Sequence, residues 1–294
     1  MPEGDTVFRT CARLHEALAG RVLVAADLRW PGLSTANLVG QTVTEVVPRG
    51  KHILQRLDSG WTLHSHLKME GQWRISRTAP NPSALSARAG GGQRRRERLD
   101  RDGRGPADIR ALLVTTEWTA TGLRLGMLDL VRTSKEDTLV GHLGPDILSP
   151  GFDHAQAIAN LNGPVGAALL DQRNVAGIGT MWASESLFLQ GLNPWADTAT
   201  LEPDALDGVI AKARRLMTAN LPHAVQTSTG IRRDGENTYV HARSGRPCRR
   251  CGTTIRVAQI GPPTRERAMF YCPTCQGGLA PGDDGHPLRP LGSR

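Results

Sequence analysis

Two sets of residues in this sequence could do chemistry, and they lie at opposite ends of the chain. The first is Met1-Pro2-Glu3-Gly4-Asp5. If Met1 is removed, Pro2 offers a terminal secondary amine, whose unperturbed pKa of roughly 8 leaves part of it neutral at pH 7. Such an amine can attack a carbonyl-like carbon and form an iminium (Schiff-base) intermediate, with the Glu3 carboxyl group beside it. Alternatively, Pro2 only permits removal of Met1, and Glu3 starts a helix.

The second set consists of four cysteines in two pairs. Cys248-x2-Cys251 and Cys272-x2-Cys275 are separated by 20 residues. Each pair brings two thiolates together, and four thiolates satisfy tetrahedral Zn²⁺ without leaving an open position. The spacing therefore predicts one structural zinc ion, whose binding folds a segment too small to fold alone.

The segment around these cysteines predicts a zinc-ribbon β-hairpin, with strands at Thr253–Val257 and Met269–Tyr271. Residues 246–275 contain six arginines and one acid. This charge favours contact with nucleic acid, although ribbons that bind proteins are also common.

A third candidate site is the turn Gly177-Ile178-Gly179, which directly precedes a helix expected at Thr180–Gln190. Glycines allow close approach of a ligand, a helix N-terminus presents unpaired N–H groups, and Arg173 adds a charge. These features are typical of a phosphate clamp. The alternative is an ordinary tight turn between two helices.

Length, charge and cysteine use limit the class of protein. The chain has 294 residues, enough for two domains and a small module, and a formal net charge of +8, which favours a polyanionic partner. No run approaches the roughly 18 apolar residues of a membrane span, and no signal sequence is evident, so we expect a cytoplasmic protein. Clustered cysteines in a reducing compartment indicate metal rather than disulfides. Cys11 lies on an apolar helical stripe and is expected to be a core thiol.

The elements that must position these groups begin with a helix over 6–19 and a β-rich domain over 1–149, a sandwich or a barrel. Strands are expected at Arg21–Trp30, Gln41–Val47, Lys51–Leu57, Trp61–Ile75, Ala111–Thr116 and Leu123–Val131. Residues 76–110 interrupt this domain with nine arginines against four acids. They predict a disordered basic insertion, either an auxiliary arm on phosphates or a solvated loop.

The second half is expected to be helical. Helices are predicted at Pro164–Gln172, Thr180–Gln190 and Pro203–Leu221, within a domain over 150–222. A linker over 223–245, a zinc finger over 246–276 and a flexible tail over 277–294 follow. The predicted fold class is therefore α+β: a β-sandwich-like domain with an N-terminal helix, a helical domain and a four-cysteine zinc-ribbon hairpin.

Four blocks of this sequence together resemble the Fpg/Nei family of DNA glycosylases (formamidopyrimidine-DNA glycosylase and endonuclease VIII). They occur in the family's order and span nearly the whole chain apart from the arginine-rich insertion and the tail. The third block resembles the family's helix–two-turn–helix signature. The blocks are Met1-Pro2-Glu3-Gly4, Arg49-Gly50-Lys51, Leu169-Leu170-Asp171-Gln172-Arg173-Asn174-Val175-Ala176-Gly177-Ile178-Gly179 and Arg265-Glu266-Arg267-Ala268-Met269-Phe270-Tyr271-Cys272.

The resemblance implies roles for single residues. Pro2 would attack C1′ of the damaged nucleotide and expel the base, and Glu3 would act as general acid near the sugar-ring oxygen. Lys51 would assist proton transfers during strand cleavage, and Arg267 would bind the phosphates that flank the lesion. An iminium at C1′ acidifies the C2′ hydrogen, so β- and δ-elimination of the phosphates follow from the same amine.

The damaged nucleotide must leave the base stack for this chemistry, and a side chain must fill the gap. The block His66-Leu67-Lys68-Met69-Glu70-Gly71 resembles the family's wedge loop. Met69 is suited to insertion between bases, and Lys68 could reach a phosphate or a base edge. The alternative for Met69 is core packing.

Two departures from the family pattern bear on the substrate. The formamidopyrimidine branch has an Asp-Pro-Arg-Arg-Phe-Gly block, whereas this chain has Leu128-Asp129-Leu130-Val131-Arg132-Thr133. The endonuclease VIII branch, which removes oxidised pyrimidines, therefore fits better than recognition of 8-oxoguanine. Thr180 stands where the family has a phosphate-binding asparagine; it can still cap a helix and donate one hydrogen bond.

The sequence thus predicts a monomeric, nucleoid-associated DNA glycosylase and abasic-site lyase of base excision repair. Its expected partner is damaged double-stranded DNA, with single-stranded or bubble DNA left open. The alternatives are a non-catalytic relative that binds DNA or abasic sites, and a zinc-ribbon regulator or RNA-binding protein.

Overall fold

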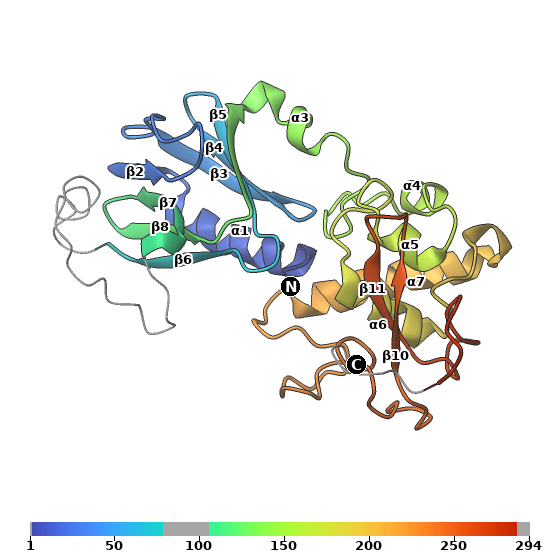
Figure 1. Ribbon diagram of the computed structural model, residues 1–294. Helices are drawn as coiled ribbons and strands as arrows, with labels where there is room; N and C mark the ends of the chain where they lie inside the picture. The colour runs from blue at the N-terminus through green and yellow to red at the C-terminus, as the bar shows by residue number, and fades with distance from the viewer. Residues whose placement is uncertain (1, 79–105, 287–294) are drawn as a thin grey trace. The chain divides into compact units, whose positions relative to one another are not determined.

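The computed structural model describes residues 2–78 and 106–286, which divide into two compact units (Figure 1). Among these residues, the first unit comprises Pro2 and Thr6–His142, and the second comprises Glu3–Asp5 and the chain from Leu143 onward. The division falls seven residues before the expected boundary at 149, because backbone hydrogen bonds attach 143–149 to the second unit. Gly144 N–H donates to Gln172 (3.0 Å) and Ile147 N–H to Ala176 (3.1 Å).

Helix α1 (Gly4–Leu18) carries the apolar stripe that the sequence predicts. Val7, Cys11, Leu14 and Leu18 are all buried in the core of the first unit. Cys11 is therefore a core thiol, as expected. The chain leaves the helix through Gly20, whose φ of 74° favours glycine.

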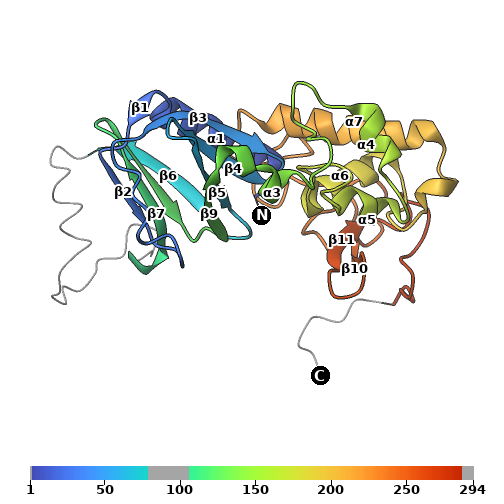
Figure 2. The ribbon, with the colours of Figure 1, turned by 90° about the horizontal axis from the view of Figure 1, so that it is seen from above.

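The first unit is a β-sandwich of two antiparallel sheets around one apolar core (Figures 1 and 2). The five-stranded sheet has the order β1 (Arg21–Val22), β3 (Thr42–Arg49), β4 (His52–Leu57), β5 (Trp61–His66), β9 (Met127–Arg132). The four-stranded sheet has the order β2 (Ala25–Leu28), β7 (Ile109–Val114), β8 (Trp118–Leu123), β6 (Gln72–Arg77). The short helices η1 (Pro106–Asp108), η2 (Thr133–Lys135) and α3 (Asp137–Val140) complete the unit.

Two expected long strands are each divided between the sheets. The run at 21–30 gives β1 and β2, and the run at 61–75 gives β5 and β6, since a turn at 67–71 interrupts it. Strand β8 was not predicted from the sequence, because its Thr-Ala-Thr-Gly stretch lacks large apolar residues. Its Ala120 and Gly122 are nevertheless buried.

The expected basic insertion at 76–110 is shorter at both ends. Ser76 and Arg77 belong to β6, and Ile109 and Arg110 belong to β7. Residues 79–105 lie outside the described part of the chain.

The second unit is built on four helices: α4 (His154–Ala159), α5 (Val165–Leu170), α6 (Thr180–Gln190) and α7 (Pro203–Asn220). A short η3 (Thr198–Thr200) precedes α7. Helix α6 has the bounds that the sequence predicts, and it is buried continuously from Thr180 to Phe188. Helix α4 was not predicted from the sequence, and its N-cap is Asp153, whose carboxylate accepts a hydrogen bond from Gln156 N–H.

The hairpin of β10 (Arg256–Ile260) and β11 (Arg267–Tyr271) packs against the helices. Ile260 and Met269 are buried in the same cluster as α6 and α7. A second cluster joins Phe188 of α6 to Ile255 of the finger.

The segments on both sides of the finger are anchored rather than loose. In the expected linker, Val240 is fully buried, and the backbone N–H groups of Tyr239, Val240 and His241 donate to the carboxylate of Glu185 on α6 (2.7–2.9 Å). Burial raises the pKa of Glu185. The linker is therefore part of the second unit's packing.

In the expected tail, Asp283 pairs with Arg256 of β10 and accepts a hydrogen bond from the Tyr271 hydroxyl (2.6 Å). Residues 277–286 are thus held on the finger. Residues 287–294 lie outside the described part of the chain.

Within residues 2–78 and 106–286, none of the helices combines the length and the hydropathy of a membrane span.

Candidate functional site

The Glu3 carboxylate is fully buried at the N-terminus of α6. Its oxygens accept hydrogen bonds from the backbone N–H groups of Gly179 (2.8 Å), Met181 (2.7 Å) and Trp182 (3.3 Å). These are the donors that a helix leaves unpaired in its first turn, and the positive end of the helix dipole favours a negative charge there. Glu3 therefore caps a helix that lies far away from it in sequence.

The glycines of the expected phosphate clamp make this contact possible. A side chain at Gly179 would overlap the Glu3 carboxyl group, and a Cβ at Gly4 would lie 2.9 Å from the Cα of Gly177. Gly4 N–H also donates to the carbonyl of Gly177 (2.9 Å), whose φ is 106°. The close approach that these glycines permit is thus made by the protein's own N-terminal segment, and Glu3 is the anion at this helix.

This arrangement corrects the expectation that Thr180 caps α6. The N-cap residue is Gly179, which has no side chain, and Glu3 supplies the capping oxygens. Thr180 is the first helical residue and is buried, at 7% exposure.

Arg173, expected at a phosphate, lies on the surface but pairs with Asp171 through two guanidinium nitrogens (2.6–3.1 Å). The hydrogen bond from Arg173 is the first cause of the lowered pKa of Asp171, and Arg265 of the finger also contributes. A phosphate would therefore compete with Asp171 for this arginine.

Asp5 is a second buried carboxylate of the N-terminal segment, and sequence reasoning assigned it no role. It accepts a hydrogen bond from the indole N–H of Trp182 (3.1 Å) and two from the amide of Gln226 (2.8 and 2.9 Å). Glu3 and Asp5 together fix the segment to α6 and to the loop after α7. No local pattern indicates these partners, because they are far away in sequence.

Pro2 is half-buried and directly precedes Glu3 in the chain. Its peptide bond to Glu3 therefore ties the candidate nucleophile to a firmly held carboxylate.

In the first unit, Lys51 lies at the tip of the β3–β4 hairpin. Arg49 and His52 are cross-strand partners, so Gly50 and Lys51 form a two-residue turn. Gly50 has a φ of 58°, the conformation that such a turn requires at its first position. Lys51 is thereby placed at one end of the sheet.

Lys68 and Met69 lie in the turn between β5 and β6. Lys68 has a φ of 53°, and its backbone N–H donates to Nδ1 of His66 (2.9 Å). Met69 is 62% exposed, which excludes the alternative that it packs in the core.

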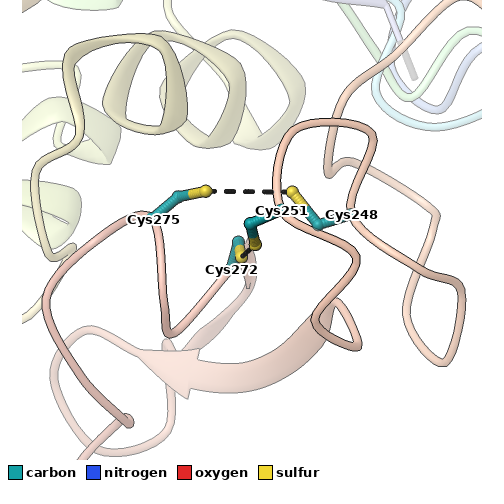
Figure 3. Close-up of side chains that lie close together, drawn as sticks. All are labelled: Cys248, Cys251, Cys272 and Cys275. Atoms are coloured by element: carbon teal, nitrogen blue, oxygen red, sulfur yellow. Dashed lines mark hydrogen bonds between the residues drawn. The ribbon is translucent and has the colours of Figure 1, made fainter.

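The four cysteines of the finger converge on one point (Figure 3). Their sulfur atoms all lie within 4.8 Å of one another, with Cys248 and Cys275 at 3.9 Å and Cys251 and Cys272 at 3.5 Å. Four sulfurs bound to a tetrahedral metal at ~2.3 Å lie ~3.8 Å apart. The cluster therefore has the dimensions of a metal site.

Arg267 begins β11 and is exposed. Arg265, two residues earlier in the hairpin turn, is also exposed and acts electrostatically on Asp171. Arg265 of the finger turn thus lies within electrostatic reach of the Asp171–Arg173 pair before α6, and sequence reasoning did not single it out.

Two family models match this chain. The formamidopyrimidine-DNA glycosylase N-terminal domain matches residues 1–98, and the formamidopyrimidine-DNA glycosylase H2TH domain matches residues 143–232.

Individual proteins are similar over nearly the whole length. A probable endonuclease 8 2 of Streptomyces coelicolor is 46% identical over 97% of both chains. The DNA-(apurinic or apyrimidinic site) lyase Nei2 of Mycolicibacterium smegmatis is 39% identical over 94% of this chain and 99% of its own. Lactococcus lactis formamidopyrimidine-DNA glycosylase, solved with abasic-site DNA, shares the fold with a TM-score of 0.72 at 19% identity. That match covers 94% of this chain and 100% of the other.

Proposed function

The chain belongs to the Fpg/Nei family of DNA glycosylases and abasic-site lyases, in its endonuclease 8-like branch, and from this premise we propose that it removes oxidised pyrimidines through Pro2. The family places it in base excision repair as a glycosylase and lyase. The proposal concerns the nucleophile, the preferred base and the residues that act on them.

The buried Glu3 carboxylate is the observation that carries this proposal. Three backbone N–H groups of the α6 N-terminus hold it, so the residue bonded to it, Pro2, has a fixed attachment. A nucleophile fixed in position avoids the entropic cost of finding its target in each encounter. The terminal amine is nucleophilic in its neutral form.

The reaction starts when the nitrogen of Pro2 attacks C1′ and the damaged base leaves with the electron pair of the glycosidic bond and takes a proton from water. The amine proton is lost, the ring oxygen takes a proton as the ring opens, and an iminium remains at C1′. One proton moves from nitrogen to oxygen, so a group that begins as a carboxylate can accept it and return it. This is the role we assign to Glu3, which becomes a general acid in the second half of the transfer.

Strand cleavage follows because the iminium draws electrons from the C2′–H bond. Loss of that proton expels the 3′-phosphate, and a second elimination expels the 5′-phosphate. Lys51, at the tip of the β3–β4 hairpin, assists these proton transfers.

Four further side chains would hold the DNA. Arg267 contacts the phosphates beside the lesion, Arg173 reaches a phosphate by exchanging its Asp171 partner, and Lys68 lies next to the wedge. The exposed Met69 fills the gap that the extruded nucleotide leaves. Thr180, buried as the first residue of α6, has a more indirect role than the asparagine it replaces.

The preference for pyrimidines rests on the residues where the other branch reads the opposite strand. Met127–Arg132 forms the regular strand β9, paired with β5 along its whole length. A paired strand projects no loop into a neighbouring groove, so it is unsuited to reading a cytosine opposite 8-oxoguanine.

The four cysteines would bind one Zn²⁺, which matches their number, chemistry and spacing. With four thiolate ligands the ion has no open position, so its role is to stabilise the finger.

Borohydride trapping on a duplex with one abasic site tests the nucleophile. The wild-type protein with a C-terminal tag should give a covalent adduct, because borohydride reduces the iminium to a stable amine. Pro2→Ala, and wild-type protein with an N-terminal tag that blocks Pro2, should give none. An adduct that persists in both would remove Pro2 from the mechanism.

A panel of duplexes with single defined lesions tests the preference. Oxidised pyrimidines should be excised faster than 8-oxoguanine opposite cytosine. The reverse order would contradict the assignment, whereas absence of base excision with intact abasic-site trapping would limit the protein to lyase activity.

A further inference from the structure

Four polar side chains form a row across three strands of the five-stranded sheet. His52 lies on β4, His64 and His66 on β5, and Asp129 on β9; His52 pairs across strands with His66, and His64 with Asp129. Residues two apart on a strand share a face, and Leu63, which directly precedes His64 on β5 and so faces the other side, is part of the core. The row therefore lies on the face of the sheet turned away from the core.

Hydrogen bonds join three of these side chains end to end. His64 Nδ1 lies 2.9 Å from Asp129 Oδ2, and His64 Nε2 lies 2.8 Å from His52 Nδ1. His64 is fully buried, whereas the Asp129 side chain is 40% exposed. The series of hydrogen bonds thus runs from His52 through the buried imidazole of His64 to the solvent-exposed carboxylate of Asp129.

The partners determine where the protons are. A carboxylate only accepts, so His64 carries its hydrogen on Nδ1, and Nε2 of the neutral ring is a lone pair. His52 Nδ1 must then donate to that lone pair. Nε2 of His52, at the opposite end of the hydrogen-bonded series from Asp129, is consequently a proton acceptor.

The surroundings keep His52 neutral. Burial is the main cause that lowers its pKa to about 3, followed by the neighbouring His66, His64 and His142 and by Lys68 from the turn after β5. The His142 ring lies 6.4 Å from that of His52, between centroids. At physiological pH the acceptor on Nε2 is therefore available.

His66 is the matching donor beside it. Its ring meets that of His52 edge to face at 4.9 Å, and its Nδ1 accepts from the Lys68 backbone, which leaves Nε2–H in the neutral ring. Burial lowers the pKa of His66 to about 3, and Lys68 and Lys51 contribute next. The electrostatic influence of Lys51 thus reaches this histidine pair.

The row is also close in the chain to the groups assigned to catalysis. His52 directly follows Lys51, and His66 comes two residues before Lys68 and three before Met69. The acceptor is therefore at the end of the sheet that carries the lysine of the proposed reaction.

We propose that Asp129, His64 and His52 form a one-proton store that takes up and returns a proton during strand cleavage. The inference rests on the proposed lyase mechanism and adds three relay residues to it. They act through Lys51 or a bridging water rather than on the DNA itself.

The three groups can take up one proton without leaving a positive charge on either buried imidazole ring. When His52 Nε2 gains a proton, His52 Nδ1 passes its own to His64 Nε2, and His64 Nδ1 passes its own to Asp129. The carboxylate becomes neutral, and both histidines stay neutral in the opposite tautomer. The reverse sequence returns the proton to the site, which suits a reaction that needs a base and then an acid.

The resting tautomers can be measured without any substrate. Long-range ¹H–¹⁵N spectra of the full-length protein should show His64 and His52 protonated on Nδ1, with an unprotonated Nε2 on His52. A His52 ring with its hydrogen on Nε2 would overturn the proposal, whatever the enzyme does to DNA.

Asp129→Asn tests proton storage against simple positioning. Its amide oxygen can still accept from His64 Nδ1, so the resting hydrogen bonds are kept, but the group can no longer take the proton. We expect single-turnover strand cleavage of an abasic-site duplex to slow by about 100-fold, the lower end of the range of acid–base catalysis. His52→Phe should give the same loss, and the double variant no more than either alone.

Thr62→Val is the matched control, since Thr62 lies on β5 on the same face as His64 but donates to Glu136 (2.5 Å). It should cleave at the wild-type rate, and circular dichroism should show all four variants folded. Borohydride trapping should be unchanged in Asp129→Asn, because iminium formation precedes the stored proton.

The outcomes separate the two levels of inference. If the wild-type protein gives no borohydride adduct, the proposed function is contradicted. If Asp129→Asn is trapped normally and cleaves at the wild-type rate, only the proposed proton store is contradicted. If His52→Phe slows cleavage and Asp129→Asn does not, the chain only positions its neighbours and the proposal fails.

Discussion

Glu3 combines a chemical role proposed from the sequence with a structural role that only the fold reveals. Its neighbour Pro2 can be the nucleophile, and its own carboxylate satisfies three N–H groups of a buried helix end. In the proposed mechanism, the two oxygens that cap the helix also transfer the proton. The glycines at 4, 177 and 179 are a requirement of this dual use, since a side chain at 4 or 179 would displace the carboxylate or its backbone.

Glu3→Gln should abolish base excision while cleavage of a preformed abasic site is retained. The amide cannot carry the proton from nitrogen to the ring oxygen, but the preformed site opens without base departure. Replacing one accepting oxygen by an NH₂ group should also cost about 0.5–2 kcal/mol of helix capping. Glycosylase and lyase assays on matched duplexes, with thermal unfolding, measure both effects.

Glu16→Gln is the control, because Glu16 is an exposed glutamate of helix α1, which begins directly after Glu3. It should leave both activities unchanged. Equal loss of excision and abasic-site cleavage in Glu3→Gln would contradict the assigned role.

At the scale of elements, two separate sets of interactions stabilise the finger. The cysteine cluster closes one end of the β10–β11 hairpin, and Cys248 and Cys272 also pack with Phe188 of α6. The second set is made by Asp283, which binds Arg256 and Tyr271 and so holds the segment after β11 on the hairpin. A small hairpin buries too little apolar surface to fold alone, which is why both are needed.

Cys248→Ser should remove the metal and loosen the finger. Three thiolates and a hydroxyl bind Zn²⁺ much more weakly, and the metal's binding energy is folding energy for such a segment. Zinc content should fall from one ion per chain towards zero, and proteolysis should begin within the finger. Cys11→Ser, in the core of the first unit, should keep its zinc.

Asp283→Asn should destabilise the finger by about 3–5 kcal/mol at neutral pH, since it leaves the Arg256 charge without its partner. The Arg256 side chain is only 7% exposed. Hydrogen exchange of the β10–β11 amides measures the loss.

The pH dependence of this effect has a definite sign. The hydrogen bonds from Arg256 lower the pKa of Asp283 from 3.8 to about 2 in the folded protein. The stabilisation is therefore complete above pH 3.8 and lost as pH falls through 2. The difference between wild type and Asp283→Asn should be constant from about pH 5 to 8; a difference that grows on acidification would contradict the ion pair.

At the scale of the whole molecule, positive charge contributes to the affinity for DNA. The chain has a formal net charge of +8. Arg265 and Arg267 are exposed in one hairpin, and Arg265 lies within electrostatic reach of Asp171, the partner of Arg173. Neutralised phosphates release counterions, so affinity for DNA must depend on salt.

The binding constant for an abasic-site duplex should fall steeply between about 50 and 200 mM salt. Arg267→Ala should weaken binding and reduce the slope of log K against log[salt] by about one, because one phosphate contact is lost. Arg29→Ala, which removes an exposed arginine paired with Asp27 in β2, should leave the slope unchanged. Competition binding at several salt concentrations measures it, and an unchanged slope in Arg267→Ala would remove that residue from the interface.

The sequence by itself determined the family, the cysteine cluster and most elements. Proline after Met1 and two Cys-x2-Cys pairs are local patterns, and the apolar stripes of α1 and α7 follow from helical spacing. These features need only neighbours in the chain, so they can be read from it. Strand β8 and helix α4 could not, because tertiary packing buries residues that have no strong local preference.

Only the tertiary structure decided what the candidate groups contact. The glycine turn predicted for a phosphate holds Glu3, Arg173 is paired with Asp171, and the histidines of β4 and β5 form one hydrogen-bonded row with Asp129. Each of these contacts joins residues through the register of a sheet or the end of a helix. Hydrogen bonds depend on distance and direction in space, and a spacing along the chain cannot specify either.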